Sequence, residues 1–110
     1  HTVAFYKNVD GNGATWAFNL ITNDQDITEN ACSVYGIDVD EDGAVDALFA
    51  ACYADTIIFA RNNDGAGTTW TTHTITSSAD CAVAVFGIDI DNDGAVDVLS
   101  ASYGDNTIAW

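Results

Sequence analysis

Short apolar segments rich in β-branched and aromatic residues alternate along the chain with clusters of Asn, Asp and Gly. Segments of this kind between turn residues are typical of β-strands, and no segment shows a helical period. The Asp-Gly pairs at 10–11 and 64–65 predict hairpin turns, because glycine adopts a positive φ without a steric penalty. The expected strands are Val3–Tyr6, Trp16–Ile21, Ser33–Ile37, Val45–Ala51, Ile57–Ala60, Trp70–Ile75, Ala84–Ile88, Val96–Ser102 and Thr107–Trp110.

The sequence repeats along with these strands. Thr2-Val-Ala-Phe-Tyr-Lys-Asn8 matches Thr56-Ile-Ile-Phe-Ala-Arg-Asn62, and Thr107-Ile-Ala-Trp110 begins a third copy. The first period is 54 residues (56 − 2) and the second is 51 (107 − 56). The extra residues fall mainly in the polar stretch 23–30, where a longer loop costs little. We therefore divide the chain into repeat one at about 2–55, repeat two at about 56–106 and the start of repeat three at 107–110.

Four antiparallel strands per repeat, recurring about every 50 residues, are the signature of propeller blades. The expected fold is therefore all-β, with two four-stranded antiparallel β-propeller-type blades plus one starting strand. A blade buries both of its faces only by stacking on neighbours. We expect the fold to be completed by oligomerisation or by a longer chain, so that the partners are other copies of the chain or further blades.

Each repeat carries the same acidic loop between two apolar strands, at 38–46 and again at 89–97, with the pattern D-x-D-x-D-G-x-x-D. Alternating oxygen ligands with glycine at the sixth position are typical of Ca²⁺ coordination. Position twelve is Phe49 or Ser100 instead of the glutamate of an EF-hand. The alternative is a polar hairpin end without a metal. The sequence predicts two Ca²⁺ sites, with ligands Asp38, Asp40, Asp42, Ala44 (carbonyl), Asp46, Asp89, Asp91, Asp93, Ala95 (carbonyl) and Asp97.

The composition narrows the possible partners. Two Lys+Arg stand against 17 Asp+Glu, for a formal charge of −15, and two bound Ca²⁺ would leave −11 (−15 + 4). Binding to nucleic acid or to an anionic membrane surface depends on basic residues, so neither partner is expected. The two cations, Lys7 and Arg61, occupy the same repeat position, and we expect them to pair with nearby carboxylates. Trp16, Trp70 and Trp110 also recur, either as inter-blade core or as a platform for sugars.

The three cysteines leave one without an intrachain partner. Cys32 and Cys52 lie symmetrically about Asp42 and are the disulfide candidates, because cross-strand neighbours in a hairpin occupy such positions. Cys81 is then free or bonded to another chain. Acidity, a loop suited to millimolar calcium and the scarcity of Lys together favour an extracellular or cell-surface location, where disulfides persist.

The residues resemble the FG-GAP/VCBS-type repeats, the calcium-loop blades of integrin-like propellers. The resemblance rests on Ser33-Val-Tyr-Gly-Ile-Asp38 before the first loop, Val98-Leu-Ser-Ala-Ser-Tyr103 after the second, Asn63-Asp-Gly and Asn106-Thr-Ile-Ala-Trp110. Propellers of this family usually close with several blades, commonly about seven, whereas this chain has two. The resemblance implies the blade type and is weak evidence for function, because such propellers serve adhesion, ligand binding, scaffolding and occasionally catalysis.

From these features we expect a calcium-stabilised extracellular structural or cell-adhesion module that assembles into a larger propeller, ring or filament. One alternative is a lectin-type carbohydrate-binding propeller module with glycan sites on the loops 8–13 and 62–67. A weaker alternative is a fragment of a propeller enzyme. No Ser/His/Asp or Cys/His constellation is repeated, so we expect no enzymatic activity.

Overall fold

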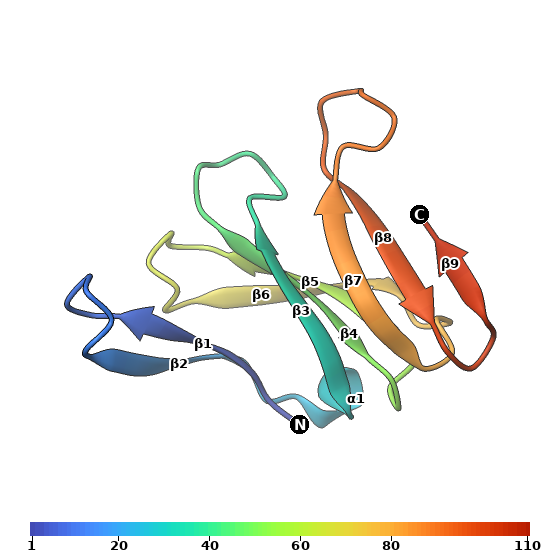
Figure 1. Cartoon of the computed structure of the whole chain (residues 1–110), viewed down its shortest axis with the longest axis horizontal. Helices are drawn as coiled ribbons and strands as arrows, with labels where there is room; N and C mark the ends of the chain where they lie inside the picture. The colour runs from blue at the N-terminus through green and yellow to red at the C-terminus, as the bar shows by residue number, and fades with distance from the viewer.

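The computed structural model describes residues 1–110 and contains nine strands and one short helix (Figure 1). All nine expected strands are present, with ends that differ by three residues or fewer. The alternation of apolar and polar positions therefore predicted the strands well. The elements are β1 (Val3–Asn8), β2 (Trp16–Thr22), α1 (Gln25–Thr28), β3 (Ala31–Ile37), β4 (Asp46–Ala51), β5 (Thr56–Asn62), β6 (Trp70–Thr76), β7 (Ala82–Ile88), β8 (Asp97–Ser102) and β9 (Thr107–Ala109).

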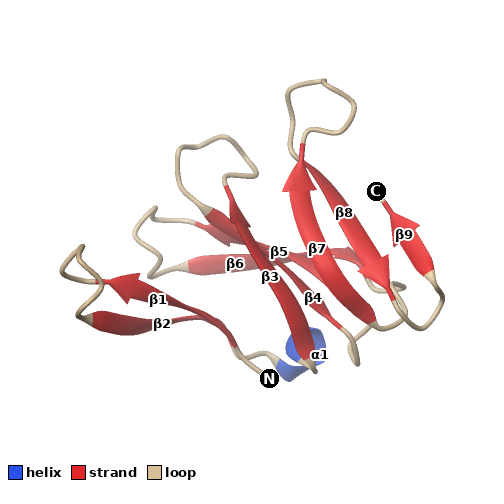
Figure 2. Cartoon of the chain, in the orientation of Figure 1, coloured by secondary structure: helices blue, strands red, loops and turns tan.

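The strands form three antiparallel sheets that follow one another along the chain (Figure 2). β1–β2 form a two-stranded sheet, β3–β4–β5–β6 a complete four-stranded sheet, and β7–β8–β9 a three-stranded sheet. The all-β class with propeller-type blades is thus confirmed. The three sheets do not close into a barrel. The strands divide as two, four and three instead of four, four and one, because repeats two and three begin at the third strand of a sheet, β5 and β9.

The chain passes from one sheet to the next at the two connections between strands that are not hairpin loops. Eight residues, 23–30, join β2 to β3, and five residues, 77–81, join β6 to β7. The difference of three residues accounts for the two periods of 54 and 51. α1 fills the longer connection and was not expected from the sequence. Its single turn is capped by Asp24, whose side chain accepts a hydrogen bond from the backbone N–H of Asp26 at 3.1 Å.

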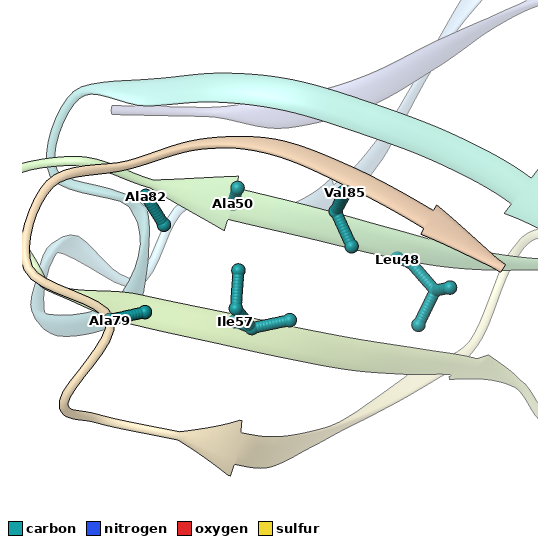
Figure 3. Packing of buried hydrophobic residues seen from close by; sticks show 6 residues of the cluster. All are labelled: Leu48, Ala50, Ile57, Ala79, Ala82 and Val85. Carbon is teal, nitrogen blue, oxygen red and sulfur yellow. The ribbon is translucent and has the colours of Figure 1, made fainter. Parts of the chain in front are cut away.

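The hydrophobic core lies on both faces of the middle sheet, and all six residues of β4 are buried. One cluster packs against β1, β2 and α1 and contains Val3, Ala47, Phe49, Ile58 and Ala60. The other fills the space between β4–β5 and the chain around β7, as Figure 3 shows, and contains Leu48, Ala50, Ile57, Ala79, Ala82 and Val85. Alternate residues of β4 therefore serve opposite faces, as the period of two in a strand requires.

The disulfide of the structure joins Cys52 to Cys81, and Cys32 is free and exposed. The predicted Cys32–Cys52 bond is therefore wrong. The predicted symmetry about Asp42 does not hold, because Ser33 lies opposite Ala50, and a bulge at Cys32 shifts the β3–β4 register by one further residue. Beyond that bulge Cys52 lies opposite Asn30, and its backbone N–H donates to the Asn30 carbonyl oxygen at 3.0 Å.

The Cys52–Cys81 bond connects two sheets, because Cys52 directly follows β4 and Cys81 directly precedes β7. Asp55 strengthens the same junction. Its side chain accepts a hydrogen bond from the Cys81 backbone N–H at 2.9 Å, and its carbonyl oxygen accepts one from Ala79 at 3.1 Å. The middle and third sheets are therefore held together by covalent, polar and apolar contacts at one end.

Replacing both Cys52 and Cys81 by Ala is expected to destabilise the chain by about 3–4 kcal/mol, because a bond with a sequence separation of 29 restricts the unfolded chain. Cys32→Ala is the matched control and should leave the free energy of unfolding unchanged. Chemical denaturation of the three proteins measures the difference. A reactive thiol at Cys81 instead of Cys32 in the wild-type protein would contradict the Cys52–Cys81 bond.

Candidate metal centre

The two acidic loops are the β3–β4 and β7–β8 hairpin loops, and they project from the same side of the molecule (Figure 1). They share one backbone conformation. Glu41 and Asn92 have φ values of 59° and 63°, and Gly43 and Gly94 have φ values of 89° and 96°. Values near 90° strongly favour glycine, which explains why the sixth position of the motif is glycine in both loops.

The first aspartate of each loop holds the turn together. Asp38 accepts hydrogen bonds from the backbone N–H groups of Asp42 at 3.2 Å and Gly43 at 2.9 Å. Asp89 makes the same pair of contacts, with Asp93 at 3.2 Å and Gly94 at 3.0 Å. The same bonds in two different sheets indicate that the local sequence determines the loop geometry.

Each loop gathers three carboxylates closely enough to hold one cation. Oxygen atoms of Asp38, Asp40 and Asp42 lie within 4.8 Å of one another in the first loop. In the second loop the cluster is Asp89, Asp91 and Asp97, so the ninth-position aspartate takes the place of the fifth. Exposed or half-buried carboxylates on a tight turn form a hard oxygen donor set, which suits Ca²⁺ or Mg²⁺ and lacks the nitrogen or sulfur ligands that zinc prefers.

Ala44 and Ala95, the expected carbonyl ligands, lie in the same turns. Their backbone N–H groups donate to Asp42 at 2.9 Å and to Asp93 at 2.8 Å. These bonds orient the fifth-position carboxylate in each loop. Each loop thus brings three of its four predicted aspartates into one cluster, which leaves out Asp46 in the first loop and Asp93 in the second.

The ninth-position aspartate also has a structural role that the sequence did not reveal. Asp46 is 2% exposed, and its two carboxylate oxygens accept hydrogen bonds from the backbone N–H groups of Val39 at 3.0 Å and Asn62 at 2.8 Å. Asp97 makes only the equivalent of the first bond, with Ile90 at 3.0 Å. Asp46 therefore ties its loop to β5, and its place at the start of a strongly apolar strand was the available signal.

A basic residue lies beside the first loop only. The Arg61 guanidinium is 2.5 Å from Asp40 Oδ2 through Nε and 3.0 Å from Asp42 Oδ2 through Nη2, so the expected pairing with carboxylates is confirmed for Arg61. The hydrogen bond from Ala44 and the pairing with Arg61 hold the pKa of Asp42 below its usual value. Asp42 and then Asp40 raise the pKa of Arg61. Lys7, at the same repeat position, forms no salt bridge.

The tryptophans at equivalent positions have different surroundings. Trp16 Nε1 donates to Gly13 O at 2.9 Å and Trp70 Nε1 to Gly67 O at 3.1 Å, so each indole fastens the loop that precedes it. Trp70 packs edge-to-face on Phe5, with ring centroids 6.2 Å apart, whereas Trp16 is 55% exposed. The expected core role applies to Trp70, and Trp110 is exposed as well.

The geometry defines a class of protein: stacked antiparallel blades with an acidic hairpin loop in successive sheets. A family model described as an FG-GAP-like repeat matches residues 38–100, from the first residue of one acidic loop to the strand after the other. The match covers more than half of the chain, so the chain belongs to the FG-GAP-like repeat family. No curated protein and no solved structure matched the chain. The one helix of the structure, α1, has four residues and could not span a membrane.

Asp46→Asn is expected to destabilise the metal-free protein by about 1–3 kcal/mol. The asparagine would have one oxygen and one NH₂ group, so one of the backbone N–H groups of Val39 and Asn62 would lose its acceptor. Asp97→Asn is the matched variant and should cost less, since Asp97 accepts one backbone bond and is only partly buried. Urea denaturation in the presence of EGTA measures both. Equal losses would show that the bond to Asn62 carries no stability.

Proposed function

We propose that the chain is a calcium-stabilised structural module of an extracellular propeller-type assembly and that it contributes to adhesion. One observation supports this role above all. Two hairpin loops in successive sheets share one backbone geometry, and each gathers three carboxylates within 4.8 Å. The carboxylates within each cluster repel one another unless a cation lies among them. A bound ion would therefore stabilise each loop at the point where it joins two core strands.

Calcium fits the donor set better than other common cations. Ca²⁺ accepts several carboxylate and carbonyl oxygens in flexible geometry, and each loop offers carboxylates at its first, third, fifth and ninth positions and an alanine carbonyl at the seventh. Mg²⁺ gives up its waters reluctantly. Two ions, one in each loop, are proposed, with Asp38, Asp40 and Asp42 as the first set and Asp89, Asp91 and Asp97 as the second.

The ion would act on the fold through the hairpins. The first loop connects β3 to β4, and β4 carries Leu48 and Phe49, which are completely buried on opposite faces of the middle sheet. A cation that holds the ends of β3 and β4 together therefore stabilises both core clusters. The extracellular setting is supported by the Cys52–Cys81 disulfide and by the surplus of acidic residues, which suit an oxidising, calcium-rich environment.

Calcium is expected to raise the melting temperature by about 10 °C or more when present at about one hundred times its dissociation constant, which corresponds to about 2.7 kcal/mol for each site. Asp40→Asn and Asp91→Asn should each remove one site in isothermal titration calorimetry and lower the calcium-dependent shift. Asp26→Asn, in α1 and outside both loops, is the matched control. An identical melting curve in calcium and in EGTA contradicts the proposed stabilisation.

The first loop is expected to bind calcium more weakly than the second, because Arg61 repels the ion and occupies Asp40 and Asp42. In a variant whose second site is removed by Asp91→Asn, the further change Arg61→Met should tighten calcium binding roughly threefold to tenfold. Lys7→Met removes the equivalent cation from β1 and should have no such effect. Terbium luminescence reports the affinity, and weaker binding after Arg61→Met would mean that the guanidinium instead organises the ligands.

A further inference from the structure

The stacking of the middle sheet on the third sheet shows how two blades of this chain fit together. The middle sheet presents one face, called the trailing face, made by Tyr35, Ile37, Leu48 and Ile57. The third sheet meets it with its leading face, made by Ala82, Val85 and Gly87. Rings of Tyr35 and Phe86 lie 4.4 Å apart between their centroids, and the Val85 backbone N–H donates to Ser33 Oγ at 3.3 Å.

Gly87 makes this interface close. A Cβ atom at Gly87 would lie 2.9 Å from Ile37 Cγ2 and 3.0 Å from Leu48 Cδ1, so only glycine lets the two sheets approach as they do. Val85 beside it is only 6% exposed. The leading face of the third sheet is therefore shaped to receive the trailing face of another blade.

The middle sheet carries the same leading face, but nothing covers most of it. Ala31, Val34 and Gly36 correspond to Ala82, Val85 and Gly87 with an offset of 51, and all three residue types are identical. Val34 is 58% exposed, against 6% for Val85, and Ala31 and Gly36 are exposed as well. The face borders a hollow of about 550 Å³, lined mainly by apolar groups that include Val34, Gly36, Ala47, Phe5, Ile21 and Trp70.

At the other end of the molecule the third sheet exposes a trailing face. Ile88 and Ile108 correspond to Ile37 and Ile57 of the middle sheet. Ile88 is 43% exposed and Ile108 81%, whereas Ile57 is 1% exposed. One molecule thus presents a free leading face and a free trailing face, whose counterparts already bind each other inside the same chain.

The β1–β2 sheet shows which strands are needed at the leading face. By the repeat, β1 and β2 correspond to β5 and β6, the third and fourth strands of the middle sheet. β1 pairs only with β2, so its other edge has no strand beside it. In the middle sheet that edge is occupied by β4. The missing neighbours of β1 are therefore a first and a second strand of the β3–β4 type.

We propose that this place is taken by β7 and β8 of a second copy of the chain, so that copies associate head to tail. The inference rests on the proposed structural role and names the partner that it requires. β7–β8 of one copy and β1–β2 of the next then form a complete four-stranded blade. Its β7–β8 strands cover Val34 and Gly36 as the middle sheet covers Val85 and Gly87. Such a heterologous contact produces a ring if it closes and a filament if it does not.

β9 occupies the required edge of β8 in the isolated chain, and it must give way to β1 of the second copy. β9 and the start of β1 are the same part of the repeat, Thr107-Ile-Ala against Thr2-Val-Ala. β9 pairs three residues with β8 and is exposed throughout. The β4–β5 register, moved by the repeat offsets of +51 and −54, aligns five residue pairs, including Ser100 with Ala4 and Leu99 with Phe5. The exchange therefore adds backbone pairs and buries the apolar faces.

A cross-linking experiment tests this register directly. Chains carrying Ala4→Cys are mixed with chains carrying Ser100→Cys, both with Cys32→Ser, and treated with a short bismaleimide without reductant. A cross-linked dimer that contains one chain of each kind is expected. Thr72→Cys replaces Ala4→Cys in the control mixture, because Thr72 is exposed on β6 away from the contact, and should give no such product.

The mass of the particle in solution provides a second test. Light scattering of the wild-type chain should give a multiple of 11.6 kDa, and Val34→Asp should reduce it to the monomer. Val9→Asp replaces a valine of similar exposure, 57%, in the β1–β2 loop and should leave association unchanged. Monomers at every concentration together with no Ala4–Ser100 product overturn the proposal. It is also overturned if Val34 is protected from solvent in a tandem fusion of two copies but remains exposed in the separate chains.

Calcium titration of the same proteins keeps the two proposals apart. Val34→Asp lies outside both loops and should bind calcium as the wild type does. Lost association in a chain that binds two ions confirms the docking face independently of the metal. Intact association in a chain that binds no calcium would contradict the metal sites and leave the docking face supported.

Discussion

The burial of both faces of the middle sheet is the interaction on which the rest of the structure depends. β4 is completely buried because alternate residues face the two neighbouring sheets, with Leu48 and Ala50 on one side and Ala47 and Phe49 on the other. The outer sheets each bury one face only. Blades of this kind have little stability alone, and stability comes from the contacts between neighbours.

The position of the acidic loops follows from this stacking. The loops are the ends of hairpins whose strands are fixed in the core, so the carboxylates are held at the surface in a repeated geometry. The first loop is also tied to its own sheet by two polar contacts, from Asp46 to Asn62 and from Asp42 to Arg61. The second loop has neither contact. Two loops with one sequence motif therefore differ in the contacts that tie them to their sheets and in local charge.

The sequence predicted the strands, the blade type and the clustering of carboxylates, because alternation and turn chemistry act over a few residues. It did not predict how the strands divide among sheets, since periodicity shows which residues share a face but not where the chain crosses over. The disulfide was missed for a similar reason: the β3–β4 register does not pair Cys32 with Cys52, and Cys81 comes close only through stacking of the third sheet. The burial of Asp46 likewise depends on β5, sixteen residues away.

Val34 and Val85 show why the exposure of a repeat cannot be deduced from its own residues. Both valines belong to the same motif, and one is open to solvent while the other is in the core. The difference lies in the neighbouring sheet, which presents Ile37 and Leu48 to Gly87 and nothing equivalent to Gly36. A repeat therefore carries the information for two complementary faces, and its neighbours decide which of them is buried. Apolar residues that are unusually exposed in one copy mark a contact surface when their equivalents are buried in another.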